Sequence, residues 1–171
     1  CDLLQIEEPL WLQGTSLMPL IRGEVDQVNE QVFAEVTFHA AYEPQRAVRT
    51  QRWKYIRRYD DEKTTPVLPN CDESEAKAVW LDHGWAARPV PQEQLYDLVF
   101  DPNESHNLLD AHGSTASPEA AAALDDLKGR LHAWMDRTDD PLLDGPVPAP
   151  SGSRINDKNG QSPGQETVTQ K

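Results

Sequence analysis

Residues 93–108, EQLYDLVFDPNESHNL, decide the expected fold. Leu95, Tyr96 and Leu98 predict a short strand, because large apolar and aromatic side chains favour a pleated, half-buried surface. The Asp-Pro pair at 101–102 predicts the turn that ends this strand, since proline fixes φ and lacks a backbone donor. A strand that closes in a tight polar loop is therefore expected here.

Two further strands are expected upstream of this stretch. Val32–Phe38 alternates between apolar and other residues, which is strand periodicity. Residues 47–59 predict a second strand, with Val48 and Ile56 on one face and aromatic residues on the other. Residues 39–45 are expected to be a long loop that joins the two strands as an antiparallel hairpin. The strand around residue 95 is expected to extend the same sheet.

The most periodic segment of the chain lies further on, at residues 118–137. Its apolar residues recur at spacings of three and four, as on the buried face of an amphipathic helix. These residues are Ala120, Leu124, Leu127, Leu131 and Trp134. Ser117 predicts an N-cap, and Pro141 prevents the helix from continuing. The sequence thus predicts an α+β fold, in which a small antiparallel sheet of three or four strands packs against one long C-terminal helix.

The chain is expected to have three parts. Residues 1–23 carry many apolar side chains that we expect to be buried, and residues 24–143 contain the predicted sheet and helix. Residues 144–171 are rich in Pro, Gly, Ser, Asn and Gln, so they are predicted to form a disordered tail. The proline-rich stretch 60–91 is predicted to be irregular, with a short helix at 73–81. Long irregular stretches of this kind often border functional sites.

The composition argues against several classes of protein. With 16 Lys and Arg against 29 Asp and Glu, the chain has a net charge of −13. Binding to nucleic acid or to an anionic membrane is therefore not expected. No stretch has the roughly 18 consecutive apolar residues that span a bilayer. Cys1 and Cys71 have no second ligand at metal spacing, so no zinc site is expected, and a disulfide between them stays open.

Four segments, taken in order, resemble phrases of the sulfatases, the sulfuric ester hydrolases of the alkaline-phosphatase-like superfamily. Residues 14–23 resemble "G.SL.PLLRG", residues 35–56 resemble "E.T.H....PMRAVRT.RYKYI", and residues 93–108 resemble "ELYDL…DP.E..NL". Residues 134–141 are similar to "W...T.DP" of the branch that resembles N-sulfoglucosamine sulfohydrolase, which is the closest branch. The resemblance covers about residues 1–150 and identifies the chain as the C-terminal portion of a sulfatase.

The resemblance implies that residues 1–23 are the end of a large catalytic domain and that residues 24–143 are the C-terminal subdomain of this larger α/β enzyme. The enzyme is expected to hydrolyse sulfate esters or sulfamates, with sulfated sugars as the expected substrates. In that family the nucleophile is a formylglycine made within Cys/Ser-x-Pro-x-Arg, and calcium binds the sulfate oxygens. Cys1 and Cys71 are each followed by Asp and lack this motif, and the acidic pairs at 60–61 and 139–140 are expected to be turn or cap residues. We therefore predict no catalytic residue and no metal ligand here. Formylglycine and calcium would belong to an upstream catalytic domain of the same polypeptide.

The residues predicted to contact substrate lie between the first two predicted strands. His39, Tyr42, Glu43 and Arg46 fall in the predicted loop 39–45 or next to it. Loops at strand ends often carry binding residues, and the planar guanidinium of arginine suits a sulfate group. The resemblance implies that this loop returns towards the catalytic pocket. These four residues are therefore predicted to bind a sulfated small molecule or glycan.

Three alternatives stay open at this point. The basic residues from Arg49 to Arg58 could form a solvated face or pair with the many acidic residues instead of binding a ligand. Arg46 could be a structural residue that ties its loop to the sheet. For the chain as a whole, the alternative is a stand-alone module that binds anionic glycans, or an inactive remnant, without hydrolysis.

Overall fold

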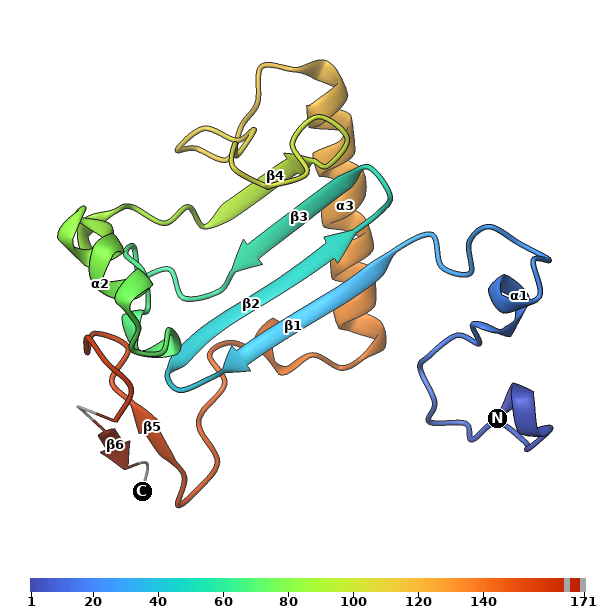
Figure 1. The fold of residues 1–171 in the computed structure, drawn as a ribbon, viewed down its shortest axis with the longest axis horizontal. Coiled ribbons are helices and arrows are strands. Elements are labelled where there is room, and N and C mark those ends of the chain that lie inside the picture. The colour runs from blue at the N-terminus through green and yellow to red at the C-terminus, as the bar shows by residue number, and fades with distance from the viewer. Residues whose placement is uncertain (165–166, 170–171) are drawn as a thin grey trace. The chain divides into compact units, whose positions relative to one another are not determined.

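The computed structural model describes residues 1–164 and 167–169 of the 171-residue chain. The chain divides into two compact units, Cys1–Val32 and Phe33–Lys171. The boundaries predicted after residues 23 and 143 stay predictions. The sheet and the long helix are shown in Figure 1.

A four-stranded antiparallel sheet, with strand order β1-β2-β3-β4, forms the centre of the fold. The strands are β1 (Val32–Phe38), β2 (Tyr42–Arg49), β3 (Trp53–Arg58) and β4 (Glu93–Asp97). Their arrows alternate in direction from one strand to the next in Figure 1, so the sheet is a simple meander. The predicted α+β fold class is confirmed, as are the strand at 32–38 and the strand around Leu95.

The long helix α3 (Pro118–Arg137) packs across one face of the sheet, over β2 and β3. Ser117 caps the helix, because its hydroxyl oxygen accepts a hydrogen bond from the backbone N–H of Ala120 at 3.2 Å. Four positions of the predicted stripe are buried, namely Ala120, Leu124, Leu127 and Leu131. The last buried position is Met135, where Trp134 was predicted. Trp134 is half-buried and stacks on Phe33 of β1, with the ring centroids 5.0 Å apart. The amphipathic helix is thus held on the sheet by one continuous apolar face.

The prediction of a single strand over 47–59, joined to β1 by a long loop, is wrong. The chain instead reverses at residues 50–52. There the backbone N–H of Thr50 donates to the carbonyl of Trp53 at 2.8 Å, and the Thr50 hydroxyl oxygen accepts from the Trp53 N–H at 3.0 Å. The turn contains no Gly, Pro or Asn, so the residues that usually mark a hairpin are absent.

The hairpin changes which residues share a face. Val48 lies opposite Tyr55 in the register of β2 and β3, and both are buried in the core cluster that includes the α3 stripe. Val48 and Tyr55 were predicted on opposite faces, which would hold only if the strand had continued without a turn. Residues 42–45, predicted to be loop, belong to β2.

The stretch 60–91 carries three short elements, which Figure 1 shows beyond the end of the sheet at which β2 begins. They are the 3₁₀ helix η2 (Leu68–Asn70), the helix α2 (Glu75–Asp82) and the 3₁₀ helix η3 (Trp85–Ala87). The short helix predicted at 73–81 is confirmed as α2, and Ser74 caps it.

The segment 144–171 has defined structure within its described residues, where disorder was predicted. It follows the short 3₁₀ helix η4 (Pro141–Leu143) and contains β5 (Arg154–Asn156), which pairs antiparallel with β6 (Thr167–Thr169). Backbone and side-chain hydrogen bonds hold the part between residues 146 and 158, although few apolar residues are available for burial.

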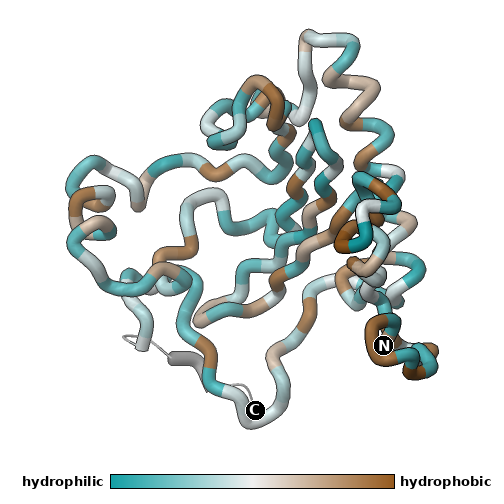
Figure 2. Tube along the Cα trace, turned by 45° about the vertical axis from the view of Figure 1, so that its right-hand side comes forward, coloured by the Kyte–Doolittle hydropathy of each residue, from teal (hydrophilic) through white to brown (hydrophobic). Residues whose placement is uncertain are grey.

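The N-terminal unit contains η1 (Asp2–Leu4) and α1 (Met18–Ile21). The apolar residues of 1–23 were expected to be buried, but Leu3 and Leu4 are each 71% exposed. Figure 2 shows that hydrophobic residues are concentrated in this segment. A unit this short cannot enclose a core of its own. No helix in the described part of the chain is long and apolar enough to cross a membrane.

Candidate functional site

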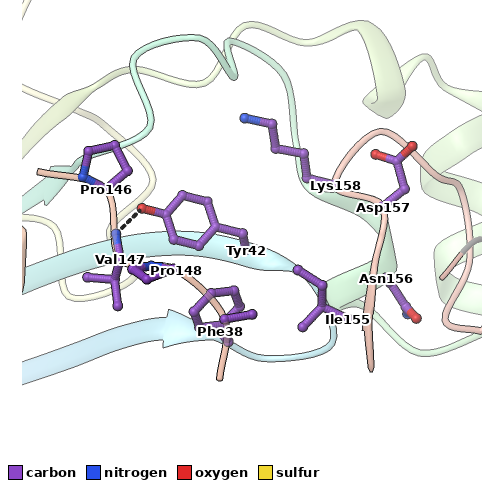
Figure 3. A pocket seen from close by; sticks show the side chains of 10 residues that line it. Phe38, Tyr42, Pro146, Val147, Pro148, Ile155, Asn156, Asp157 and Lys158 are labelled. Atoms are coloured by element: carbon purple, nitrogen blue, oxygen red, sulfur yellow. Dashed lines mark hydrogen bonds between the residues drawn. The ribbon is translucent and has the colours of Figure 1, made fainter. Parts of the chain in front are cut away.

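Tyr42, one of the four predicted substrate-binding residues, lines a pocket of about 400 Å³ near the end of the sheet where β1 passes into β2 (Figure 3). Phe38 packs beside it, with the two ring centroids 5.0 Å apart. Residues 146–149 form one wall and residues 155–158 form the other. The pocket therefore has an aromatic floor, an apolar wall and a polar wall.

Both walls are held in place by contacts of the C-terminal segment. The Val147 backbone N–H donates to the Tyr42 hydroxyl oxygen at 3.3 Å, as Figure 3 shows. The Asn156 backbone N–H donates at 2.8 Å to a carbonyl in the turn between β1 and β2. The Lys158 ammonium donates to the Asp60 carboxylate at 2.6 Å. The shape of the pocket thus depends on a segment that the sequence pattern did not connect with it.

Arg46 does not line this pocket, since its side chain is 2% exposed and fully engaged within the chain. Its Nε and Nη2 donate to the two carboxylate oxygens of Asp140 at 2.5 and 3.1 Å. Nη1 donates to the carbonyls of Val36 and Gln45 at 2.8 and 2.9 Å, and Nη2 also donates to the Thr37 hydroxyl at 3.2 Å. A guanidinium has five N–H donors, so none is left for a substrate. The structure supports the structural alternative for Arg46.

The surroundings of Asp140, the partner of Arg46, favour the ionised form of its carboxyl group. Burial acts to raise the pKa of Asp140, but hydrogen bonds from Arg46 and from the Leu142 N–H, together with the charge of Arg46, hold that pKa below its usual value. The Leu142 N–H donates to the Asp140 carboxylate at 3.0 Å, which starts η4. The pair therefore ties β2 to the segment that follows α3.

The other two predicted residues also lie outside the pocket. Glu43 follows Tyr42 along β2, and successive residues of a strand point to opposite faces. Its carboxylate accepts from the Asn70 amide at 2.8 Å and lies 3.5 Å from Nη2 of Arg58. His39 is exposed in the turn between β1 and β2. The structure thus brings Tyr42 together with the C-terminal segment and not with His39, Glu43 or Arg46.

Most basic residues of β3 and the preceding turn are paired with acidic residues. The ion pairs Arg52–Asp97, Lys54–Glu104 and Arg57–Glu93 have N···O distances of 2.8, 2.6 and 3.2 Å. Arg58 is 2% exposed, and its Nε and Nη2 have no hydrogen-bond partner among the described residues. Burial lowers the pKa of Arg58, while the charges of Glu43 and Asp60 oppose that change. Pairing accounts for Arg52, Lys54 and Arg57 without a ligand, but two buried nitrogen atoms of Arg58 stay unsatisfied among the described residues.

The described part of the chain contains no cluster of three or more His, Cys, Asp or Glu that could hold a metal ion. The Asp60 and Asp140 carboxylates are bound by Lys158 and Arg46, so calcium would have to displace these cations, and the residues present do not fit a calcium site. Neither cysteine lines the pocket at Tyr42.

Comparisons of sequence and of structure find that this chain is similar to sulfatases. No protein-family model matches the chain. The ulvan-active sulfatase of Formosa agariphila is 28% identical over 156 residues, which is 84% of this chain and 29% of the relative. A solved structure described as a 2-O GAG sulfatase has a TM-score of 0.57 and 25% identity, over 88% of this chain and 26% of that one. A protein solved with its substrate D-glucosamine-2-N,6-O-disulfate has a TM-score of 0.53 and 21% identity, over 82% of this chain and 23% of that one.

The sheet and helix described above are therefore a fold that occurs as one part of sulfatases. The chain is similar to sulfatases over most of its own length, and it spans less than a third of the length of the proteins it matches. The predicted resemblance to sulfatases is thus confirmed as a similarity in sequence and fold. The assignment to the N-sulfoglucosamine sulfohydrolase branch stays a prediction.

Proposed function

We propose that this chain is the C-terminal portion of a sulfatase that hydrolyses sulfate esters or sulfamates of sugars. In this proposal the chain forms one wall of the substrate pocket, and an upstream domain of the same polypeptide performs the chemistry. The observation that carries the proposal is the joint similarity in sequence and fold, which extends over 84% of the chain in one sulfatase and 88% in another. The remaining length of these proteins is where a catalytic domain would lie.

The pocket at Tyr42 supports a role in binding substrate. The rings of Tyr42 and Phe38 offer an apolar surface, and a sugar ring presents a face of C–H groups that packs on such rings. His39, exposed on the adjacent turn, stays in the proposed set of substrate contacts. Glu43 and Arg46 act instead through hydrogen bonds that hold this end of the sheet.

The upstream domain would also supply the formylglycine and the calcium ion proposed for the complete enzyme. No step of hydrolysis is assigned to a residue of this chain, because the Asp60 and Asp140 carboxylates are bound to cations and the cysteines lack the Cys/Ser-x-Pro-x-Arg motif. The exposed apolar side chains of residues 1–23 are the proposed contact with that domain.

The 171-residue chain by itself is expected to show no sulfatase activity, because it holds no nucleophile. The measurement is the release of 4-nitrocatechol from its sulfate ester by the purified chain, with heat-inactivated chain as the control. Turnover above that control would contradict the assignment of the chemistry to upstream residues.

A further inference from the structure

A second pocket, of about 820 Å³, lies between α2, η3 and β4, and its volume is within the range of small-molecule sites. Three aromatic residues, Trp80, Trp85 and Tyr96, contribute to its lining. Arg88 and Gln94 add polar groups. Most of the lining belongs to the irregular stretch 60–91 and to β4, and none of it takes part in the pocket at Tyr42.

Among these aromatic residues, Trp80 leaves the most surface available to a ligand, whereas Tyr96 is buried. Trp80 is 53% exposed on α2, where a ring of this size would ordinarily be covered. The Tyr96 hydroxyl donates to the Gln94 side-chain oxygen at 2.8 Å. The Gln94 amide nitrogen has no hydrogen-bond partner in the part of the chain that the structure describes, so it is available as a donor. The exposed ring of Trp80 and the amide donor of Gln94 match a sugar, which has an apolar face and a rim of hydroxyl groups.

The positive charge of Arg88 in this pocket favours anionic sugars over neutral ones. The guanidinium of Arg88 lies 5.4 Å from the centroid of the Trp80 ring, and it has no carboxylate partner among the described residues. This is notable in a chain with a net charge of −13. The acidic residue of the lining, Glu104, is already paired with Lys54 at 2.6 Å. The planar fork of Arg88 is therefore available for a sulfate or a carboxylate.

The wall that carries Trp80 is fixed before any ligand binds. The Lys77 side chain is 1% exposed, and its ammonium donates to the carbonyls of Leu68 and Cys71 at 3.1 and 2.7 Å. It also donates to the Glu73 carboxylate at 2.9 Å. These bonds anchor α2 to the preceding segment. A preformed wall reduces the ordering that a ligand would otherwise have to impose.

We propose that this pocket binds an anionic oligosaccharide, with a sugar ring stacked on Trp80 and its sulfate or carboxylate paired with Arg88. The inference goes beyond the proposed function, because it concerns binding by this chain alone and requires no hydrolysis.

Calorimetric titration of the 171-residue chain tests the charge preference. The probes are a heparin-derived tetrasaccharide, a hyaluronan tetrasaccharide, which has carboxylates but no sulfate, and neutral cellotetraose. The heparin probe is expected to bind more tightly than cellotetraose, and Arg88→Gln should weaken its binding by about tenfold or more, as charged hydrogen bonds do. Arg137→Gln removes the same charge from an exposed position at the end of α3, away from the pocket, and should leave binding unchanged. If hyaluronan binds like heparin, a carboxylate is sufficient; if it binds like cellotetraose, sulfate is required.

Variants at Trp80 test the stacking. Trp80→Ala should weaken binding of the heparin probe, whereas Trp80→Phe, which keeps a ring, should retain part of it. Trp11→Ala is the matched control, because Trp11 is 78% exposed and lies outside the pocket. The inference is overturned if no probe binds saturably, or if the Arg88 and Trp80 variants bind heparin like their controls. Since no turnover is measured, this outcome is separate from any failure of the complete polypeptide to hydrolyse sulfate.

Discussion

Replacing Arg46 with Met is expected to lower the free energy of unfolding by about 3–5 kcal/mol, the cost of breaking a buried ion pair. The substitution removes all five hydrogen bonds of the guanidinium and leaves the Asp140 carboxylate buried without its cation. The measurement is urea denaturation of the 171-residue chain followed by circular dichroism.

Two further variants make this prediction specific. Arg49→Met changes an exposed arginine on the same strand. Its free energy of unfolding should lie within about 0.5 kcal/mol of that of the unsubstituted chain. The double variant Arg46→Met/Asp140→Asn should be more stable than the sum of the two single changes predicts, because no unpaired charge remains. A loss at Arg46 no larger than that at Arg49 would show that the pair does not stabilise the fold.

The pair also predicts a pH dependence. Because the pKa of Asp140 is held below its usual value in the folded chain, its contribution to stability is fully present above the unfolded pKa of about 3.9. That contribution is lost as the pH falls through the lower, folded pKa. The difference in the free energy of unfolding between the unsubstituted chain and the Arg46→Met variant should therefore become smaller below about pH 4.

Leu131→Ala is expected to lower the free energy of unfolding by about 2–5 kcal/mol, as truncation of a buried leucine does. Leu131 is 3% exposed, in the apolar stripe by which α3 packs on the sheet. Leu4→Ala makes the same chemical change at a residue that is 71% exposed, and it should have little effect. The measurement is the melting temperature of each variant. Equal losses at Leu131 and Leu4 would contradict the assignment of α3 as the main packing element.

Much of the fold could be predicted because its signals are local. The stripe of α3 repeats within one segment, and its cap, Ser117, directly precedes it. The alternation of β1 likewise lies within one strand. In contrast, the hairpin turn at 50–52 could not be predicted, because the reversal uses a threonine hydroxyl in place of the usual turn residues.

The candidate site was harder to predict because its contacts join distant parts of the sequence. Arg46 and Asp140 are 94 positions apart, and nothing near Arg46 in the sequence indicates that its charge is already matched. The wall that faces Tyr42 comes from residues 146–158, whose low apolar content predicted disorder. That segment is hydrogen-bonded to Tyr42, to the turn between β1 and β2 and to Asp60, and none of these contacts leaves a periodic signal in the sequence.

The proposed function is tested by the release of inorganic sulfate from sulfated oligosaccharides by the complete polypeptide that the gene encodes. We predict that this polypeptide contains Cys/Ser-x-Pro-x-Arg upstream of the present chain and releases sulfate. Replacing that Cys or Ser with Ala should abolish the release. A complete polypeptide that lacks the motif and releases no sulfate would rule out the proposed sulfatase and would favour a module that binds glycans without hydrolysing them.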